Sequence, residues 1–215
     1  MASDLVLHGR LQRGDLDLRV ELSIGSGVTA LIGPNGVGKT SVLRIIAGLD
    51  ALSSGELRLG EQVLDRPADN RFVAPEDRDV AYAFQEPRLF PHLSVLDNIA
   101  YPRRREGRSG TDARADARRV ATALALDDLV ELRPRDLSGG QAQRVNVARA
   151  LAADASTLLL DEPLASIDDH SRDDLRRRLR ESGSTRVVWV THDPSDLSHA
   201  DRVISLPDVV RTDAR

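Results

Sequence analysis

A glycine-rich loop between an apolar run and a helical pattern is the feature that most constrains the fold of this 215-residue chain. The run Val28–Ile32 has the length and composition of a buried strand. Thr40–Leu49 places apolar residues at helical spacing, with Gly48 near the end of the pattern. The loop between them, residues 33–40, is Gly-Pro-Asn-Gly-Val-Gly-Lys-Thr. A strand that turns through glycines directly into a helix is typical of α/β folds with a largely parallel sheet.

The loop has the pattern G-x-x-x-x-G-K-[ST], whose residue types suit a chain of phosphate groups. Glycines let the backbone approach phosphates and turn its N–H groups inward, and the following helix N-terminus adds a positive dipole. Lys39 is the only lysine among 30 basic residues, and we expect this compact charge to reach the β- and γ-phosphates. We expect the Thr40 hydroxyl to hold Mg²⁺. A purely structural glycine turn is the alternative. The expected nucleotide-binding residues here are Gly33, Pro34, Asn35, Gly36, Val37, Gly38, Lys39, Thr40 and Ser41.

Two carboxylates follow a second apolar strand. The run Thr157–Leu160 ends directly in Asp161 and Glu162. Because ligands of parallel sheets bind at the carboxyl ends of the strands, we expect both side chains near the phosphates. Asp161 is the candidate Mg²⁺ ligand, through water, and Glu162 the candidate general base for the attacking water. Taken alone, the pair is equally consistent with a helix cap or a surface turn.

Single polar residues follow two further apolar runs. His192 comes after Val187–Val190, and Gln85 comes after Val80–Phe84. A lone histidine is usually structural, but at this edge of the sheet His192 is placed to contact the γ-phosphate. Gln85 is placed to reach Mg²⁺ or the attacking water. We therefore predict Glu162, His192 and Gln85 as catalytic residues, with Thr40, Gln85 and Asp161 at the metal.

Composition excludes several other classes. The formal net charge is −4, whereas nucleic-acid binders usually carry a basic excess, so we expect no nucleic-acid partner. Without cysteines the chain forms no disulfide and no cysteine-based zinc site. No run of 18 apolar residues spans a membrane, and residues 1–10 lack an apolar signal core, so we expect a cytoplasmic protein.

The remaining segments indicate how the elements are ordered. Residues 5–24 alternate between apolar and polar, as β-strands do, and residues 50–80 favour short strands and turns. Residues 86–150 change to helical patterns, with helices expected at Val120–Leu132 and Gln141–Ala153. The start of the Arg-rich stretch Arg103–Arg119 is expected to be an exposed loop. The order predicts an α/β fold with an inserted helical subdomain.

The sequence Leu137-Ser138-Gly139-Gly140-Gln141, followed by Gln143-Arg144, is the most specific motif. Its plain interpretation is a helix cap at Ser138, and its functional interpretation is a second anion site at a helix N-terminus. It resembles the signature motif of ATP-binding cassette (ABC) ATPases. The resemblance covers nearly the whole chain, and the other motifs of that family follow in order. They are similar to the Walker A loop (33–40), the Q-loop glutamine (Gln85), Walker B with its glutamate (158–162), the D-loop (164–168) and the switch histidine (His192).

The resemblance implies a P-loop NTPase fold in a single domain, residues 1–215. Its nucleotide-binding core would comprise 1–85 and 151–215, with an N-terminal antiparallel β subdomain, and its helical signature subdomain 86–150. It implies ATP hydrolysis with Mg²⁺ and a dimer that encloses two ATP molecules. Each Walker A loop then faces the signature of the other copy. The residues implied to contact ATP in this way are Ser138, Gly139, Gly140 and Gln141 in trans, and Asp168 of the D-loop.

The segment Phe84–Val95 resembles the importer type of this family, most of all the ATPase subunits of molybdate importers. Sulfate, ferric-ion, polyamine and sugar importers are alternatives, as is a non-transport ABC ATPase. An importer implies a separate membrane permease, indirectly a solute-binding protein, and a position on the inner face of the membrane. Phe90, Pro91 and Leu93 would suit the apolar contact with the permease. The family usually stacks adenine on an aromatic residue ahead of the Walker A loop, but residues 8–20 contain none. Either Arg13 or another planar group takes that place or base stacking is weak, and the adenine contacts stay open.

Overall fold

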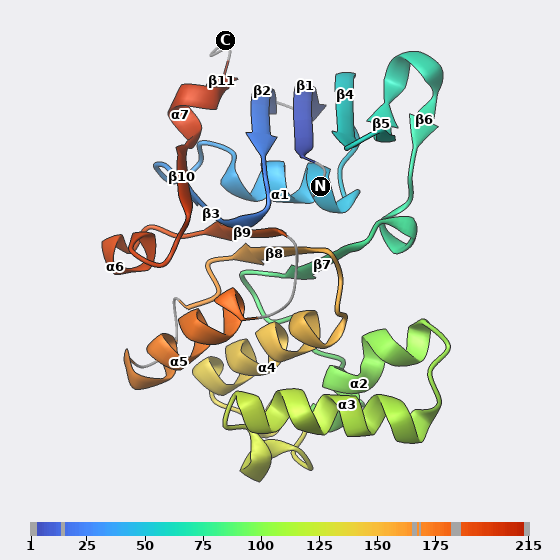
Figure 1. Ribbon diagram of the computed structural model, residues 1–215, viewed down its shortest axis with the longest axis vertical. Helices are drawn as coiled ribbons and strands as arrows, with labels where there is room; N and C mark the ends of the chain where they lie inside the picture. Colours follow the sequence, from blue (N-terminus) through green and yellow to red (C-terminus); the bar gives the residue numbers. More distant parts are fainter. Residues whose placement is uncertain (1–3, 14–15, 165–166, 168, 182–185, 213–215) are drawn as a thin grey trace. The chain divides into compact units, whose positions relative to one another are not determined.

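In the computed structural model, strand β3 (Gly27–Ile32) runs into the glycine-rich loop and helix α1 (Lys39–Ala47) leaves it, as expected (Figure 1). The structure describes residues 4–13, 16–164, 167, 169–181 and 186–212. The chain forms two units, one comprising Met1–Val80 with Thr185–Arg215 and the other Ala81–Ser184. These units are defined by compactness alone, so the functional division at 86–150 stays a prediction.

Parallel strands lie at the centre of the first unit. Strand β3 pairs in parallel with β9 (Arg186–Val190) on one side and with β10 (Arg202–Ser205) on the other. All five residues of β9 are buried, which explains why it reads as a continuous apolar run rather than as an alternating pattern. The predicted parallel sheet is therefore confirmed, and the loop after β3 lies at the carboxyl edge of these strands.

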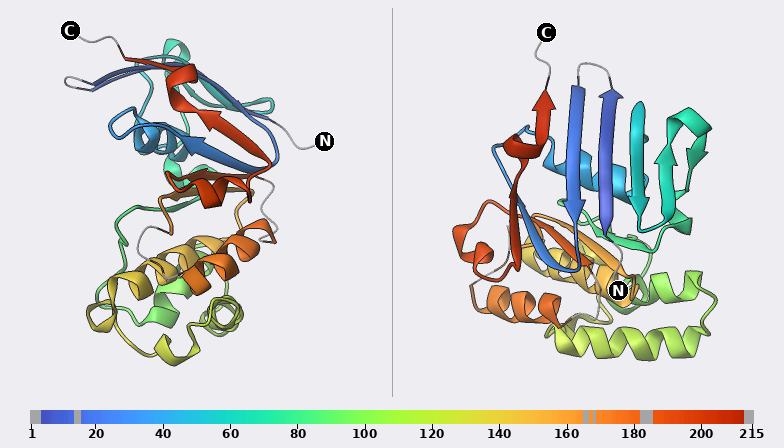
Figure 2. Two further views of the ribbon diagram at one scale, coloured as in Figure 1. Left: turned by 90° about the vertical axis from the view of Figure 1, so that its left-hand side faces the viewer. Right: turned by 45° about the horizontal axis from the view of Figure 1, so that its top comes forward.

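An antiparallel sheet completes this unit. Strands β1 (Leu5–Arg13) and β2 (Leu16–Ile24) pair along their whole lengths, and alternate residues of β1 are buried. The sheet order is β11-β2-β1-β4-β5-β6. The other members are β4 (Ser54–Leu59), β5 (Gln62–Arg66), β6 (Arg71–Phe72) and β11 (Val210–Thr212). Helix α1 lies against one face of this sheet (Figure 2). The predicted N-terminal antiparallel subdomain is confirmed, and the sheet also takes in a strand from near the C-terminus. Two short helices, α6 (Pro194–Leu197) and α7 (Leu206–Val209), flank β10.

A buried arginine closes the C-terminal end of α1. Only 5% of Arg78 is exposed, and its guanidinium donates to the carbonyls of Ile45 (2.7 Å) and Ile46 (2.9 Å). It also donates to the carbonyls of Val73 (2.9 Å) and Leu64 (3.4 Å). The last carbonyls of a helix have no intrahelical partner, so a cation at this end satisfies them and complements the dipole. Arg78 thus ties α1 to the strands that follow it.

The second unit is mainly helical. Strands β7 (Val80–Ala83) and β8 (Thr157–Asp161) are neighbours in a sheet, and α5 (Asp169–Arg180) follows β8. Helices α2 (Val95–Arg105), α3 (Gly110–Ala123) and α4 (Gly139–Ala152) contact one another, as Figure 1 shows. The interrupting helices that the sequence predicts are therefore present.

The predicted helix at 120–132 is wrong in position. Helix α3 begins ten residues earlier, because the Ser109 side chain accepts a hydrogen bond from the Asp112 N–H (3.1 Å) and caps it. Ala113, Ala117 and Ala121, four residues apart, are fully buried and form the packing face. Alanines contribute little to an apolar pattern, so the arginines around them made the start of this stretch resemble a loop. The connecting turn lies between α2 and α3, and Arg103 itself is helical.

Candidate functional site

Parts of the glycine-rich loop have a backbone conformation that only glycine adopts without strain. Gly36 and Gly38 have φ values of +81° and +104°. A Cβ atom on Gly38 would lie 2.7 Å from Cδ1 of Leu18 on β2, whereas one on Gly36 would meet open space. The loop is therefore packed against the sheet at its end and open to an incoming group at its tip.

The start of α1 presents positive charge, and its own first turn supplies no anion. Lys39 is 7% exposed, and its Nζ donates to the carbonyls of Gly33 (2.8 Å) and Pro34 (3.1 Å), so the ammonium lies over the loop. The N-cap Gly38 provides no side-chain hydrogen bond and the first turn of α1 holds no acidic residue. By contrast, α2, α3 and α4 each begin at a serine that caps the helix. The start of α1 has the chemistry of a phosphate site.

His192 follows the neighbouring parallel strand at the same edge. Leu31 of β3 pairs with Val190 of β9, and the Thr191 N–H donates to the Leu31 carbonyl at 3.3 Å. The residues after both strands therefore leave the sheet together, and the His192 side chain is exposed there. A hydrogen bond between Thr191 Oγ1 and the buried Asp196 carboxylate fixes the turn. Within the first unit, the phosphate loop and the predicted switch histidine thus come together.

The second unit brings together two of the predicted catalytic residues. Gln85 Nε2 donates to Glu162 Oε2 at 3.2 Å. Asp161 is 2% exposed at the end of β8, and it accepts a hydrogen bond from the Tyr82 hydroxyl at 3.0 Å. Glu162 has φ +50°, in the left-handed region that a glutamate rarely adopts, and such strain often marks a functional position. Tyr82 was missed by sequence reasoning, although its place in β7, three residues before Gln85, was a usable signal.

The signature motif forms the start of α4. Ser138 is the N-cap, and its Oγ accepts from the Gln141 N–H (3.3 Å) while the Ser138 N–H donates to Gln141 Oε1 (2.8 Å). This reciprocal capping box is the plain interpretation of the motif. Ser138 and Gly139 are exposed, and a Cβ on Gly139 would meet nothing. The surface of the helix start is therefore free to receive a group from outside, and its role in trans stays a prediction.

Helix α4 also holds the backbone on both sides of Gln85. Asn146 Nδ2 donates to the Phe84 carbonyl at 2.8 Å, and Arg149 donates to the Arg88 carbonyl at 2.7 Å. The Arg149 guanidinium lies 5.6 Å from the centre of the Phe90 ring, and burial lowers its pKa. Neither α4 residue was singled out from the sequence. The available signal was weak, an asparagine between Val145 and Val147 in the sequence.

A third polar side chain, Asn98 of α2, fixes the far end of this segment. Asn98 is fully buried and accepts from the Phe90 N–H (2.8 Å) while donating to the Phe90 (3.2 Å) and Ser94 (2.9 Å) carbonyls. The segment expected to face the permease is therefore shaped by hydrogen bonds to its backbone, and its side chains are left to make other contacts.

The donors predicted for Mg²⁺ fit that ion in kind. Thr40 and Asp161 offer a hydroxyl and a carboxylate, and Gln85 an amide carbonyl, which are the hard oxygen donors that Mg²⁺ prefers. Across the residues that the structure describes, no cluster of three or more His, Asp or Glu side chains is arranged to hold a metal. A set of one hydroxyl, one amide carbonyl and one carboxylate is not such a cluster, so that finding does not test it.

The structure does not place two of the predicted residues, Asp168 and Arg13, at the site. Asp168 of the expected D-loop lies outside the described residues. Arg13, suggested as a planar partner for adenine, has a side chain that is 66% exposed and pairs with Asp50 at 3.2 Å. In the described part of the chain, none of the helices has the length and apolar content needed to span a bilayer.

Comparisons with known proteins add independent information. A family model described as "ABC transporter" matches residues 17–165. The molybdenum import ATP-binding protein ModC of Mycobacterium tuberculosis is 44% identical over 201 residues, covering 89% of this chain and 54% of that protein. The sn-glycerol-3-phosphate import ATP-binding protein UgpC of Chromobacterium violaceum is 36% identical over 194 residues, covering 88% of this chain and 50% of that protein. The chain thus spans about half the length of the curated relatives it matches.

A solved structure is similar over almost the whole chain. It is the dimeric post-hydrolysis state of the ATP-binding cassette MJ0796 bound to ADP and Pi. Its TM-score is 0.78 at 28% identity, covering 95% of this chain and 94% of that one. The likeness confirms the predicted fold class, a mostly parallel α/β core with an antiparallel β subdomain.

Proposed function

The chain belongs to the ABC transporter family, and we propose that it is the ATP-binding and ATP-hydrolysing subunit of an importer. The observation that carries the proposal is the start of α1, where Lys39 lies over the loop carbonyls and the helix N-terminus has no side-chain cap. A triphosphate supplies the anion that this arrangement lacks. The post-hydrolysis structural relative, bound to ADP and Pi, supports the same interpretation.

In this proposal the loop residues 33–41 bind the phosphates through backbone N–H groups and the Lys39 ammonium. Thr40, Gln85 and Asp161 hold Mg²⁺, which when bound neutralises charge on the phosphate oxygens. The Tyr82 hydroxyl, hydrogen-bonded to Asp161, orients that carboxylate. Loss of ATP binding in Lys39→Ala, measured with a fluorescent ATP analogue, tests this half of the site. Unchanged affinity would contradict it.

Hydrolysis is assigned to three side chains. Glu162 accepts the proton of the attacking water, and Gln85, at 3.2 Å from it, orients that water and the metal. His192 donates to the γ-phosphate and stabilises its developing charge. The Gln85–Glu162 hydrogen bond supports a shared role, because it brings together two residues that are 77 positions apart in the sequence.

The signature residues 138–141 are proposed to contact the γ-phosphate bound by a second copy of the chain, with Asp168 also at that interface. The exposed start of α4, with open space beside Gly139, supports such a contact. Ser138→Arg is expected to abolish hydrolysis and ATP-dependent dimers while ATP binding by the monomer persists. Light scattering with and without ATP shows whether ATP-dependent dimers form. Equal loss of both activities would refute completion of the site in trans.

Transport is the proposed use of this ATPase. Its partners are membrane permease subunits, and indirectly a solute-binding protein, which place it on the cytoplasmic face of the membrane. We propose molybdate or a related oxyanion as the solute, because ModC is the more similar of the two relatives compared, at 44% against 36% identity. Glycerol-3-phosphate, sulfate, ferric ion, polyamines and sugars are alternatives. The test is stimulation of ATPase activity in the reconstituted complex by each solute on its binding protein. Stimulation by another solute alone would overturn the oxyanion assignment.

Purification of the native complex tests the importer role itself. A co-purifying membrane subunit supports it. Recovery of the chain with ribosomes or DNA would instead identify a non-transport ABC ATPase and refute the proposal.

A further inference from the structure

Helices α2 and α3 carry a concentration of positive charge that the proposed function does not use. Residues 95–123 contain seven arginines and four carboxylates, in a chain whose formal net charge is −4. The sequence around them has low complexity, but the structure gives several of these arginines defined positions.

A surface cavity of about 620 Å³ lies among these arginines. Its lining comprises Arg104 of α2 together with Gly110, Thr111, Arg114, Ala115 and Arg118 of α3. Three arginines thus line the cavity, and its described lining contains no carboxylate. The other lining residues, Gly110, Thr111 and Ala115, are small.

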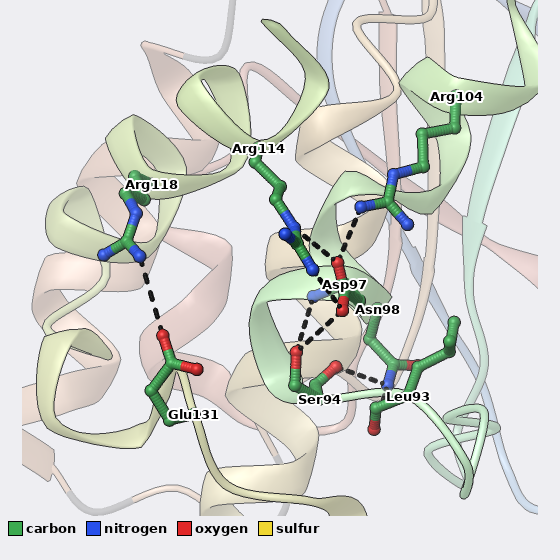
Figure 3. A network of polar contacts seen from close by, with 8 residues as sticks. All are labelled: Leu93, Ser94, Asp97, Asn98, Arg104, Arg114, Arg118 and Glu131. Carbon is green, nitrogen blue, oxygen red and sulfur yellow. Dashed lines mark hydrogen bonds and ion pairs between the residues drawn. The ribbon is translucent and has the colours of Figure 1, made fainter. Parts of the chain in front are cut away.

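The neighbouring carboxylates leave a surplus of positive charge and of donors (Figure 3). Asp97 accepts from Arg104 (2.7 Å) and, through two bonds, from Arg114 (2.9 and 3.0 Å). The bond to Arg114 holds the pKa of Asp97 below its ordinary value, so one negative charge faces two positive ones. Among the described residues, Arg118 pairs with Glu131 at 3.5 Å, and both side chains are mostly exposed.

Donors on these arginines remain unused. A guanidinium carries about five N–H donors, and neither Asp97 nor Glu131 occupies more than two on any one of them. The Nε of Arg104 is buried and makes no hydrogen bond in the described structure. The side chains of Arg114 and Arg118 are 54% and 60% exposed, so their unused donors are open to an acceptor from solution.

We propose that this cavity binds a phosphate group through the guanidinium groups of Arg114 and Arg118, with Arg104 adding charge behind them. Planar guanidinium forks match the oxygens of a tetrahedral phosphate, and several converging on one cavity give charge-assisted hydrogen bonds. The phosphate belongs either to a soluble phosphate compound or to an anionic lipid headgroup. The site lies entirely within the second unit and does not depend on ATP hydrolysis.

Inorganic phosphate is the first probe, titrated calorimetrically into the full chain saturated with Mg-ADP to occupy the glycine-rich loop. Arg118→Gln removes one cavity charge. Arg119→Gln is the matched control, because Arg119 is mostly exposed, pairs with Asp116 and does not line the cavity. We expect Arg118→Gln to weaken phosphate binding at least about tenfold and Arg119→Gln to leave it unchanged. Circular dichroism melting checks that both variants fold.

Vesicles of phosphatidylcholine with and without phosphatidylglycerol are the second probe, in a flotation assay. Binding only to the anionic vesicles, reduced in Arg118→Gln but not in Arg119→Gln, supports a lipid headgroup. Phosphate binding without vesicle binding supports a soluble phosphate compound. Equal binding by all three chains in both assays, or no binding by the wild type in either, overturns the proposal. If Mg-ADP itself fails to bind, the proposed ATPase function fails, and the cavity is then tested in Lys39→Ala.

Discussion

Replacing the buried arginine at the end of α1 is the sharpest test of how the phosphate loop is supported. In Arg78→Met the side chain keeps much of its apolar length but loses every donor. The Ile45 carbonyl retains the Gly48 N–H and the Leu64 carbonyl retains the Val73 N–H. The carbonyls of Ile46 and Val73 are left without a hydrogen-bond partner in the described part of the chain.

The magnitude follows from these two groups. A buried polar group that loses its partner costs about 1–3 kcal/mol, so two fully buried groups would cost about 2–6 kcal/mol. The Ile46 carbonyl is buried, but Val73 is only half-buried, which lowers the expected cost. Arg78 is itself largely desolvated, which lowers its pKa, and removing that unfavourable burial places the expected loss towards the lower half of the range. We therefore expect Arg78→Met to lower the free energy of unfolding by about 2–4 kcal/mol.

Urea unfolding followed by tryptophan fluorescence measures this loss in the unit concerned. Trp189 is the only tryptophan of the chain and is buried in β9, within the same unit as Arg78. Arg71→Met is the control, because Arg71 is exposed and makes one weak bond, to the Val63 carbonyl at 3.4 Å. If Arg78→Met and Arg71→Met unfold at the same urea concentration, the guanidinium does not support α1 and the reasoning is refuted.

Three further predictions concern separate parts of the molecule. Glu162→Gln should slow hydrolysis about 10²–10⁴-fold and leave ATP binding intact, measured as phosphate release and nucleotide affinity; wild-type turnover would contradict the general-base role. Gly36→Ala should lower the free energy of unfolding by about 1 kcal/mol through its positive φ alone, and Gly38→Ala by more, because the new methyl group meets Leu18. Equal urea midpoints would disprove the Leu18 contact. The lowered pKa of Asp97 means that its ion pairs stabilise the fold above about pH 4 and are lost as pH falls through the lowered value. The stability difference between the wild type and Asp97→Asn should therefore shrink in acid, and a difference independent of pH would refute this.

The order of strands and motifs could be predicted from the sequence because it depends on local patterns. The loop at 33–40 and the carboxylates after β8 are contiguous signals, and each lies at the end of the strand expected for it. Helix α3 was misplaced because its packing face consists of alanines, whose burial depends on neighbouring helices rather than on their own hydrophobicity. The residues that hold the backbone on both sides of Gln85, namely Asn98, Asn146 and Arg149, are ordinary polar side chains in the sequence. They gain meaning only when the fold brings distant carbonyls to them.

The backbone conformation at Glu162 affects which substitutions at this position would stabilise the protein. A glutamate with φ +50° costs about 1 kcal/mol relative to a glycine, and asparagine also tolerates this region. Glu162→Gly or Glu162→Asn should therefore raise the melting temperature of the unit that contains it. Any procedure that optimises this sequence for thermal resistance would tend to remove the carboxylate proposed to activate water. Selection for folding stability alone would not keep a glutamate at position 162.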